Sequence, residues 1–220
     1  MKETQLRGIY VDRSKIYTKN LVPGKQVYTE RLFKWDGVEY REWIPQKSKL
    51  AAGIKNRLTQ IGIRPGVKVL YLGASTGTTC SHVSDILGKK GELFALDFAP
   101  RTQRELVFLS QTRSNMACLL EDAKCPEDYS SKVPEVDVVF QDIAQRDQAE
   151  IFIKNCNMFL KKGGFGLVAV KARSIDVKKK PKQIFTEFRK KLENKLVVVD
   201  SKTLEPFEKD HYLFVIKKTK

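Results

Sequence analysis

Metal-binding side chains are scarce in this chain of 220 residues, which contains four cysteines and two histidines, His82 and His211. The cysteines are Cys80, Cys118, Cys125 and Cys156. They form no CxxC pair, so the close ligand spacing of a structural zinc site is missing and we expect no metal. Free, mostly buried thiols are the simplest interpretation, with a disulfide as the alternative in an intracellular protein of a thermophile.

Long hydrophobic runs are also missing. The longest, such as the one that ends at Val170, fall far short of the roughly 20 apolar residues that a membrane-spanning helix needs. The first five residues are polar and contain no apolar region of a signal peptide. We therefore expect an intracellular, cytoplasmic, soluble protein. Hydrophobic residues make up 41% of the chain, which is enough for a core in one full domain plus a small one.

Positive charge is concentrated at the two ends of the chain. The net charge is +15, of which residues 1–60 contribute +7, residues 61–160 contribute −2 and residues 161–220 contribute +10. Basic ends around a near-neutral centre indicate a surface for a polyanion, and we favour a nucleic acid. The alternative is the lysine-rich composition of a thermophilic protein, but glutamate would then rise together with lysine.

Turn-forming residues divide the beginning of the chain into short segments with strand character. Residues 7–13, 15–20 and 37–43 are rich in aromatic and β-branched side chains, and Pro-Gly and Asp-Gly pairs interrupt the region. The pattern predicts a small antiparallel β domain over residues 1–47. Such a sheet is too small to be stable alone, so we expect it to pack against residues 48–220.

From residue 48 onward, predicted strands and helices alternate. Ser48 is expected to cap a helix over residues 49–60. Further helices are expected at residues 78–87, 101–111, 147–160 and 182–193, and strands at residues 67–74, 92–98, 116–120, 136–143, 165–171, 196–200 and 212–216. This alternation predicts an α/β fold with a seven-stranded, mostly parallel sheet covered by helices on both faces. No convincing helix separates the last two strands, so the final one is expected to enter antiparallel, in a mixed arrangement at the sheet edge.

Small and acidic residues follow the first three strands of this predicted sheet. They are Gly73, Ala74, Thr78, Thr79, Asp97, Phe98, Asp122 and Ala123. The carboxyl ends of parallel strands form the ligand-binding edge of such sheets, so we expect these residues to surround a ligand. Asp97 lies about twenty positions after the glycine loop, where a carboxylate can accept hydrogen bonds from both hydroxyls of a ribose.

Two cofactors fit this layout, a nicotinamide dinucleotide and S-adenosylmethionine. A dinucleotide needs the GxGxxG loop, whose amides meet the pyrophosphate, and here three residues separate Gly73 from Gly77. S-adenosylmethionine has no phosphate, and its adenine needs an apolar neighbour and a polar clamp. Phe98 and Asp122 provide these groups, so we favour S-adenosylmethionine over a dinucleotide oxidoreductase.

Four polar residues in unusual positions are candidates for catalysis. They are Lys49, Asp142, Lys171 and His211. A ribose 2′-hydroxyl is a poor nucleophile that must be aligned and must lose its proton. Lys171, if its pKa is depressed, is the candidate general base, and Asp142 would orient it near the sulfonium. Lys49 and His211 would position the hydroxyl or the adjoining phosphate, and no metal is required.

Across almost its whole length, the sequence resembles the archaeal-type fibrillarin family. The matching segments are YREW at 40–43, SKLAA at 48–52, YLGA at 71–74, GTT at 77–79, SHVSD at 81–85, PR at 100–101, LEDA at 120–123, DIAQ at 142–145, DQAE at 147–150, KKGG at 161–164, KARSID at 171–176 and LEPFEKDH at 204–211. This resemblance implies a Rossmann-like S-adenosylmethionine-dependent methyltransferase fold behind a small β domain. It also implies RNA 2′-O-ribose methylation, within a box C/D ribonucleoprotein, of rRNA and of tRNA nucleotides that a guide RNA selects.

The resemblance assigns residues and partners as well. The family's Lys-Asp-Lys-His set corresponds to Lys49, Asp142, Lys171 and His211. Its cofactor contacts correspond to Ala74, Thr78, Thr79, Asp97, Phe98, Asp122, Ala123, Asp142 and Gln145. The implied partners are a box C/D guide RNA and its target RNA, a Nop-type scaffold protein and a ribosomal-type protein that binds kink-turns.

Four features depart from the family pattern. Asp97 stands where the family often has glutamate, and Gln141 stands where an acid is common. The glycine loop reads ASTG at 74–77 instead of two small residues that end in serine. The glycine-arginine-rich N-terminal tail of eukaryotic relatives is also absent from the sequence. Two other functions remain as alternatives, methylation of protein glutamine side chains and a non-catalytic RNA-binding subunit. The basic ends favour RNA over a protein substrate, and the complete set of four polar residues favours catalysis.

Overall fold

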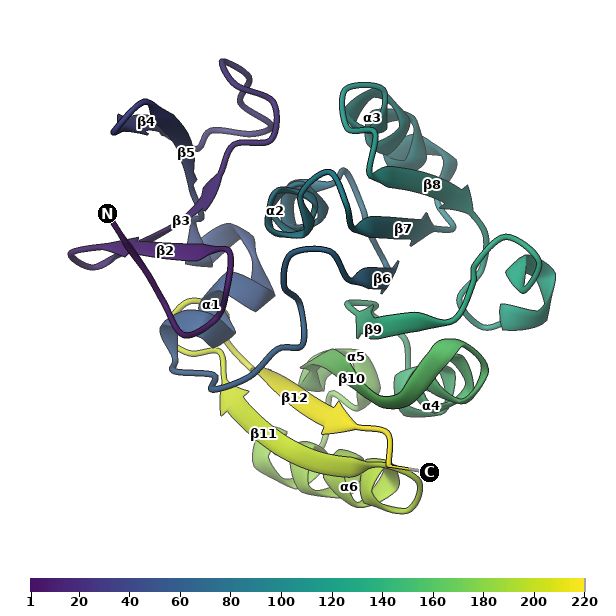
Figure 1. Ribbon diagram of the computed structural model, residues 1–220. Helices are drawn as coiled ribbons and strands as arrows, with labels where there is room; N and C mark the ends of the chain where they lie inside the picture. Colours follow the sequence, from purple (N-terminus) through teal and green to yellow (C-terminus); the bar gives the residue numbers. More distant parts are fainter. Residues whose placement is uncertain (220) are drawn as a thin grey trace.

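The computed structural model describes residues 1–219 and contains two β-sheets (Figure 1). The smaller sheet is antiparallel throughout and has the order β1-β2-β3-β5-β4. Its strands are β1 (Lys2–Glu3), β2 (Ile9–Asp12), β3 (Lys15–Lys19), β4 (Leu32–Trp35) and β5 (Val38–Glu42). The antiparallel N-terminal sheet is thus present as predicted, with β1 and β4 as two strands that the sequence pattern did not indicate.

The larger sheet has seven strands in the order β11-β12-β10-β9-β6-β7-β8. They are β6 (Lys68–Leu72), β7 (Glu92–Asp97), β8 (Met116–Leu120), β9 (Val136–Gln141), β10 (Leu160–Lys171), β11 (Val197–Thr203) and β12 (His211–Lys217). β12 runs antiparallel to both of its neighbours, as expected. It lies between β10 and β11 instead of at the sheet edge, because its apolar residues are buried on both faces whereas β11 is mostly half-exposed.

Helices cover both faces of the larger sheet, which confirms the predicted α/β fold. They are α1 (Lys49–Lys55), α2 (Thr78–Leu87), α3 (Pro100–Ser110), α4 (Gln148–Phe159), α5 (Ala172–Ile175) and α6 (Pro181–Glu193), with short 3₁₀ turns η1 (Pro45–Lys47) and η2 (Pro126–Tyr129). Apolar residues of α1, α2 and α3 form one core with one face of the sheet, and those of α4 and α6 form a second core with the other face.

Helix α1 is shorter than the predicted segment 49–60. Ser48 caps it as expected, since its Oγ accepts a hydrogen bond from the Ala51 amide at 3.3 Å. The helix ends at Lys55, and Arg57 then adopts a left-handed conformation with a φ of 64°. The apolar residue Leu58 is buried, but it lies just after this turn and not in a further turn of the helix. The apolar residues thus keep a helical spacing beyond Lys55, although the backbone no longer forms a helix there.

The cysteines are unpaired, as expected. All four cysteines are free thiols, with Cys80 and Cys156 buried, Cys118 half-buried and Cys125 exposed. Burial raises the pKa of the Cys80 and Cys156 thiols, so both stay protonated.

Within residues 1–219, no helix is long and apolar enough to cross a membrane.

A buried cluster of charges joins the N-terminal sheet to helix α2. Arg41 on β5 has no exposed side-chain surface and pairs with Glu30 at 2.7 Å and with Asp85 on α2 at 2.8 Å. The other oxygen of Asp85 pairs with Arg113 at 2.7 Å. Two cations and two anions therefore compensate one another inside the protein, where an unpaired charge would be costly. Figure 1 shows this sheet lying against α2 at one side of the molecule.

His82 belongs to the same interface and is structural. The hydroxyl of Thr18 donates to Asp85, so it accepts from Nδ1 of His82, which is 2.8 Å away. Nε2 of His82 then accepts a hydrogen bond from the Tyr28 hydroxyl at 2.6 Å. The imidazole also stacks on Trp43 with the ring centroids 4.9 Å apart. These partners define one neutral tautomer of His82.

The neutral state of His82 predicts that the protein loses stability in mild acid. Burial, and then the charges of Arg41 and Arg113, lower the pKa of His82 well below 6.5. The unfolded chain takes up a proton below about pH 6.5 that the folded chain does not bind, so stability falls by about 1.4 kcal/mol for each further pH unit. Urea unfolding at pH 7.5 and 5.5 measures this loss. The same pH change should destabilise a His82→Gln variant by about 1.4 kcal/mol less than it destabilises the unaltered protein. Equal losses of stability in the two proteins would refute the neutral state of His82.

Candidate active site

Gly73 brings the ends of two neighbouring strands close together. It follows β6 with a φ of 83°, and a Cβ atom there would lie 2.3 Å from the carbonyl oxygen of Asp142. The Asp142 amide donates to the Leu72 carbonyl at 2.9 Å, which continues the pairing between β6 and β9. Only glycine fits this contact, since any side chain would force the two strand ends apart. Asp142 is thus held directly beside the glycine loop.

Asp97, at the end of β7, holds the next part of the loop in place. Its Oδ2 accepts from the Ser75 amide at 2.7 Å, and its Oδ1 accepts from the Ala99 amide at 2.9 Å and from Thr102 at 3.0 Å. Ser75 has a φ of 51°, and the Asp97 bond supports this left-handed conformation. A carboxylate has about four acceptor positions, so three protein donors leave about one position for a ligand.

A cavity of about 270 Å³ lies at this edge of the sheet. It is lined by Gly73, Leu96, Asp97, Phe98, Asp122, Ala123, Asp142, Ile143, Ala144, Gln145 and Ile151. Seven of the predicted cofactor residues are among them. The Phe98 ring is 65% exposed, which leaves it free to stack against a ligand. The sequence prediction missed the apolar walls contributed by Leu96, Ile143, Ala144 and Ile151, although the first three adjoin residues that it named.

Three predicted cofactor residues lie beside the cavity and not in its wall. Ala74 is buried in the core and its amide donates to the Leu96 carbonyl at 2.9 Å. Thr78 and Thr79 begin helix α2, and the Thr79 hydroxyl donates to Oγ of Ser48 at 3.0 Å. Thr79 therefore connects the glycine loop to the residue that caps α1. This contact fixes the position of Lys49, the first residue of that helix.

Lys49 and Asp142 form an ion pair at the cavity. The Lys49 Nζ lies 2.9 Å from Oδ1 and 3.1 Å from Oδ2 of Asp142, with both side chains mostly buried. Burial by itself lowers the pKa of Lys49, but the charge and the hydrogen bond of Asp142, with a further contribution from Glu208, outweigh it and raise the pKa. Lys49 is therefore a stable cation and not a proton acceptor. Asp142 was expected to orient Lys171, whereas its partner in the structure is Lys49.

Lys171 and His211 are opposite one another on adjacent antiparallel strands, β10 and β12. Directly paired residues of this kind point to the same face of a sheet, so the two side chains are neighbours. Lys171 is exposed and has no ion pair within residues 1–219, whereas His211 is only 7% exposed. The four candidate residues thus form two pairs, Lys49 with Asp142 and Lys171 with His211.

The orientation of His211 is determined by the loop before it. Nδ1 lies 2.7 Å from the Lys209 carbonyl, which can only accept, so Nδ1 carries a hydrogen and the neutral ring has its lone pair on Nε2. Glu208 lies 3.9 Å from Nδ1 of His211 and also acts on Lys49 through its charge. Glu208, which the sequence interpretation overlooked, therefore stands between the two pairs.

The seven-stranded sheet, its antiparallel strand β12 and the cavity at the strand ends define a Rossmann-like methyltransferase of the S-adenosylmethionine-dependent class. The Fibrillarin family model matches residues 1–220, and the chain belongs to the fibrillarin family. Both the predicted fold class and the predicted family are confirmed.

Relatives of the chain include proteins of known structure. This chain is 50% identical over 224 residues to the fibrillarin-like rRNA/tRNA 2′-O-methyltransferase of Pyrococcus abyssi. The match covers 100% of this chain and 99% of the relative. Aeropyrum pernix fibrillarin, solved with natively bound S-adenosyl-L-methionine, superposes with a TM-score of 0.90 and 40% identity, covering 98% of this chain and 96% of that one. A fibrillarin in complex with Nop5p superposes with a TM-score of 0.88 and 37% identity, covering 99% and 100%.

Proposed function

We propose that this protein transfers the methyl group of S-adenosylmethionine to the 2′-hydroxyl of a ribose in rRNA and tRNA. The observation that carries the proposal is the Lys49–Asp142 ion pair, which lies at the edge of the cavity. It combines a buried cation, a carboxylate and a neighbouring cavity at one place. The substrates named for the Pyrococcus abyssi relative and the cofactor bound by Aeropyrum pernix fibrillarin support the same reaction.

The cavity residues fit S-adenosylmethionine, which supplies an electrophilic methyl group on a sulfonium when bound. The exposed Phe98 ring offers a stacking surface for the adenine, and Asp122 and Gln145 offer polar contacts. Asp97, whose carboxylate keeps an acceptor position beyond its bonds to the protein, accepts from the ribose hydroxyls. Asp142 places a negative charge beside the site where the sulfonium would lie.

The remaining residues act on the RNA. Lys171 takes the proton of the 2′-hydroxyl, and His211, opposite it on β12, positions the ribose beside Lys171. Lys49 stays protonated and provides a fixed positive charge for the adjoining phosphate. Asp142 determines where that charge lies. This division of roles keeps Lys171 as the general base but makes Asp142 the positioning partner of Lys49.

The substrate nucleotide is selected by partners. We propose that a Nop-type scaffold, a kink-turn-binding protein and a box C/D guide RNA hold the target RNA at the site, in the cytoplasm. The solved complex of a fibrillarin with Nop5p supports the scaffold, and the net charge of +15 supports the RNA. We also propose residue 47 as the domain boundary, because the two sheets lie on either side of it in the chain.

Removal of the Phe98 ring should weaken cofactor binding. Stacking of a base on an aromatic side chain contributes about 1–3 kcal/mol, so Phe98→Ala should raise the Kd for S-adenosylmethionine by about 5- to 150-fold. Isothermal titration calorimetry measures the change. Phe108→Ala, at a ring that is 55% exposed and not part of the cavity, is the control and should bind normally. An unchanged Kd for Phe98→Ala would exclude stacking on this ring.

The proposed function is tested by methyl transfer from tritiated S-adenosylmethionine to RNA. The isolated chain should bind the cofactor but methylate little RNA. Activity should appear when the scaffold, the kink-turn protein and a matching guide are added. Strong site-specific methylation by the isolated chain would contradict the dependence on partners, and no methylation under any condition would contradict the proposed reaction.

A further inference from the structure

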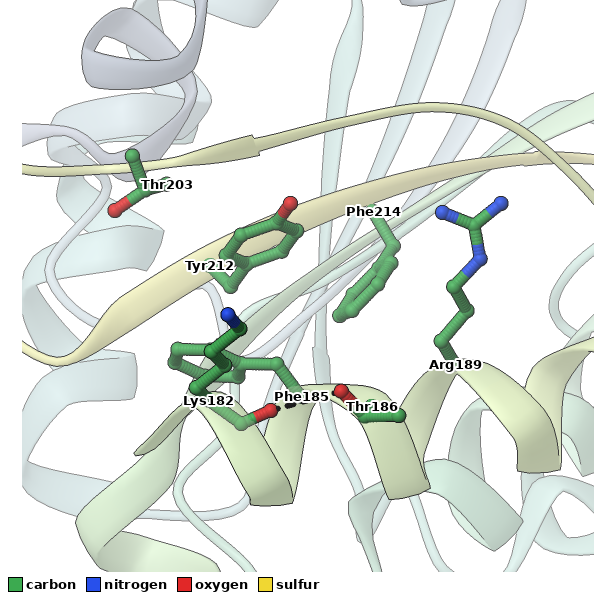
Figure 2. Close-up of a pocket in the computed structure, with 7 residues that line it drawn as sticks. All are labelled: Lys182, Phe185, Thr186, Arg189, Thr203, Tyr212 and Phe214. Carbon is green, nitrogen blue, oxygen red and sulfur yellow. Dashed lines mark hydrogen bonds between the residues drawn. The ribbon is translucent and has the colours of Figure 1, made fainter. Parts of the chain in front are cut away.

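A second groove, of about 390 Å³, lies between helix α6 and the outer strands of the large sheet. Figure 2 shows its lining, with Lys182, Phe185, Thr186 and Arg189 on the helix and Thr203, Tyr212 and Phe214 on the strands. Its volume suits a nucleotide-sized ligand. None of its residues lines the cofactor cavity, so it is a separate site.

The sequence of α6 explains why this groove stays open. Ile184, Phe188 and Leu192 recur every four residues and are buried, and Phe188 and Leu192 pack in the core with the sheet. A second stripe lies beside this buried one and consists of residues 182, 185, 186 and 189, which recur at intervals of three and four positions. It faces the strands outside the core. Lys182 and Arg189 project from the helix towards the strands in Figure 2. The side chains of this second stripe form one wall of the groove.

Aromatic rings form much of the groove. The Phe185 and Tyr212 ring centroids are 5.0 Å apart, and those of Tyr212 and Phe214 are 4.9 Å apart. Phe185 and Tyr212 are only half-buried, so part of each ring remains accessible to a ligand. A flat, partly exposed aromatic surface of this kind suits stacking by a nucleobase.

The charge at the groove is positive. Lys182 is exposed and has no ion pair within the described residues, and the exposed Arg189 has a bond only to Glu193, one turn away on the helix. No acidic residue contributes to the lining. Three further lysines, at residues 178–180, precede the helix, and of these Lys179 is paired with Glu187. An anionic ligand therefore meets the free cation of Lys182 and the exposed guanidinium of Arg189 at this groove.

Consecutive residues of β12, His211 and Tyr212, belong to the candidate active site and to the groove. Tyr212 follows His211 directly, and successive residues of a strand point to opposite faces. Leu213 and Tyr212 accordingly belong to the two different cores. A chain that leaves the neighbourhood of His211 thus needs only to pass the end of β12 to reach the groove on the other face.

We propose that this groove binds a single-stranded segment of RNA that flanks the methylated nucleotide. The inference rests on the proposed function, since it assumes that RNA lies at His211. A base stacks on Phe185 and Tyr212, and the phosphates on either side are bound by Lys182 and Arg189. The combination of accessible rings with the unpaired Lys182 and with Arg189, whose partner Glu193 is itself exposed, favours RNA over a protein segment, which would require complementary acids or an apolar surface without cations.

Binding of a fluorescent single-stranded oligoribonucleotide to the full chain tests the groove. The double variant Lys182→Glu with Arg189→Glu should bind about 10- to 100-fold more weakly, and its salt dependence should lose a slope of about 1.4 for two phosphates. The matched control is Lys190→Glu with Lys195→Glu, which makes the same charge change at exposed positions outside the groove. This control should lose at most a few-fold. A 5-iodouridine oligonucleotide should crosslink to Tyr212 or Phe185.

Two further measurements separate this proposal from the proposed function. Both variants should bind S-adenosylmethionine normally, and the reconstituted complex should still methylate target RNA that lacks the flanking segment. Equal RNA affinity and salt slope in the two double variants would overturn the groove proposal while leaving the methyltransferase intact. Loss of scaffold binding without loss of RNA binding in the groove variant would also overturn it, because the occupant would then be a protein.

Discussion

Replacing Lys171 with alanine should reduce methyl transfer in the reconstituted complex by about 10²–10⁴-fold, the usual contribution of a general base. The affinity for S-adenosylmethionine should stay within about twofold, because Lys171 does not line the cofactor cavity. The structure favours Lys171 over Lys49 as the base, since Asp142 keeps Lys49 charged. Single-turnover kinetics measure the methyl-transfer step, and calorimetry measures cofactor binding.

Three other variants make this experiment specific. Lys162→Ala removes another exposed lysine of β10 and should leave the rate unchanged. Lys49→Arg keeps a positive charge beside Asp142 and should retain part of the activity, whereas Lys171→Arg provides no usable base and should retain none. Near-normal turnover of Lys171→Ala would exclude it as the base and would direct attention to Nε2 of His211.

Replacing Arg41 with methionine should destabilise the protein by about 3–5 kcal/mol, the cost of breaking a buried ion pair by removing one partner. Glu30 and one oxygen of Asp85 would lose their cation in the interior. Since Arg41 joins the N-terminal sheet to α2, this sheet should detach before the rest of the fold is lost. Urea unfolding monitored by tryptophan fluorescence reports on the change, because Trp43 stacks on His82 at this interface.

An exposed ion pair provides the comparison for Arg41. Lys191 and Glu150 approach to 2.7 Å, but both side chains are more than half exposed. Lys191→Met should therefore cost no more than about 1 kcal/mol. Similar losses in the two variants would show that the buried cluster contributes no more than a surface pair.

The order of strands and helices could be predicted because each element has a local pattern. Helix α2 begins and ends at the predicted residues, and β8 does as well. β4 and the end of α1 were missed for different reasons. β4 is only four residues long and is stabilised by pairing with β5, and a left-handed residue ends α1 where the apolar spacing continues. Pairing with a neighbouring strand and the conformation of a single residue therefore decide features that the apolar pattern leaves open.

The candidate site shows the same limit. The sequence indicated Lys49, Asp142, Lys171 and His211 because each lies next to an apolar strand or at a helix start. Which of them form pairs depends on the tertiary structure, which brings Lys49 at the start of α1 to Asp142 after β9 and places β12 beside β10. The buried Arg41 cluster was not foreseen either, because Arg41 and its partner Asp85 are separated by 44 positions in the sequence. Burial of such charges cannot be inferred from composition.

Mapping the methylated atom tests the central claim most directly. The complete complex is given S-adenosylmethionine and a target RNA, and the modified nucleotide is identified by mass spectrometry with and without a complementary guide. A ribose methyltransferase of this kind should place one methyl group on the 2′-oxygen of the guide-selected nucleotide. The same RNA with a single 2′-deoxy nucleotide at that position should receive none. Methyl transfer to the deoxy RNA, or to protein glutamine instead of RNA, would contradict ribose methylation by this site.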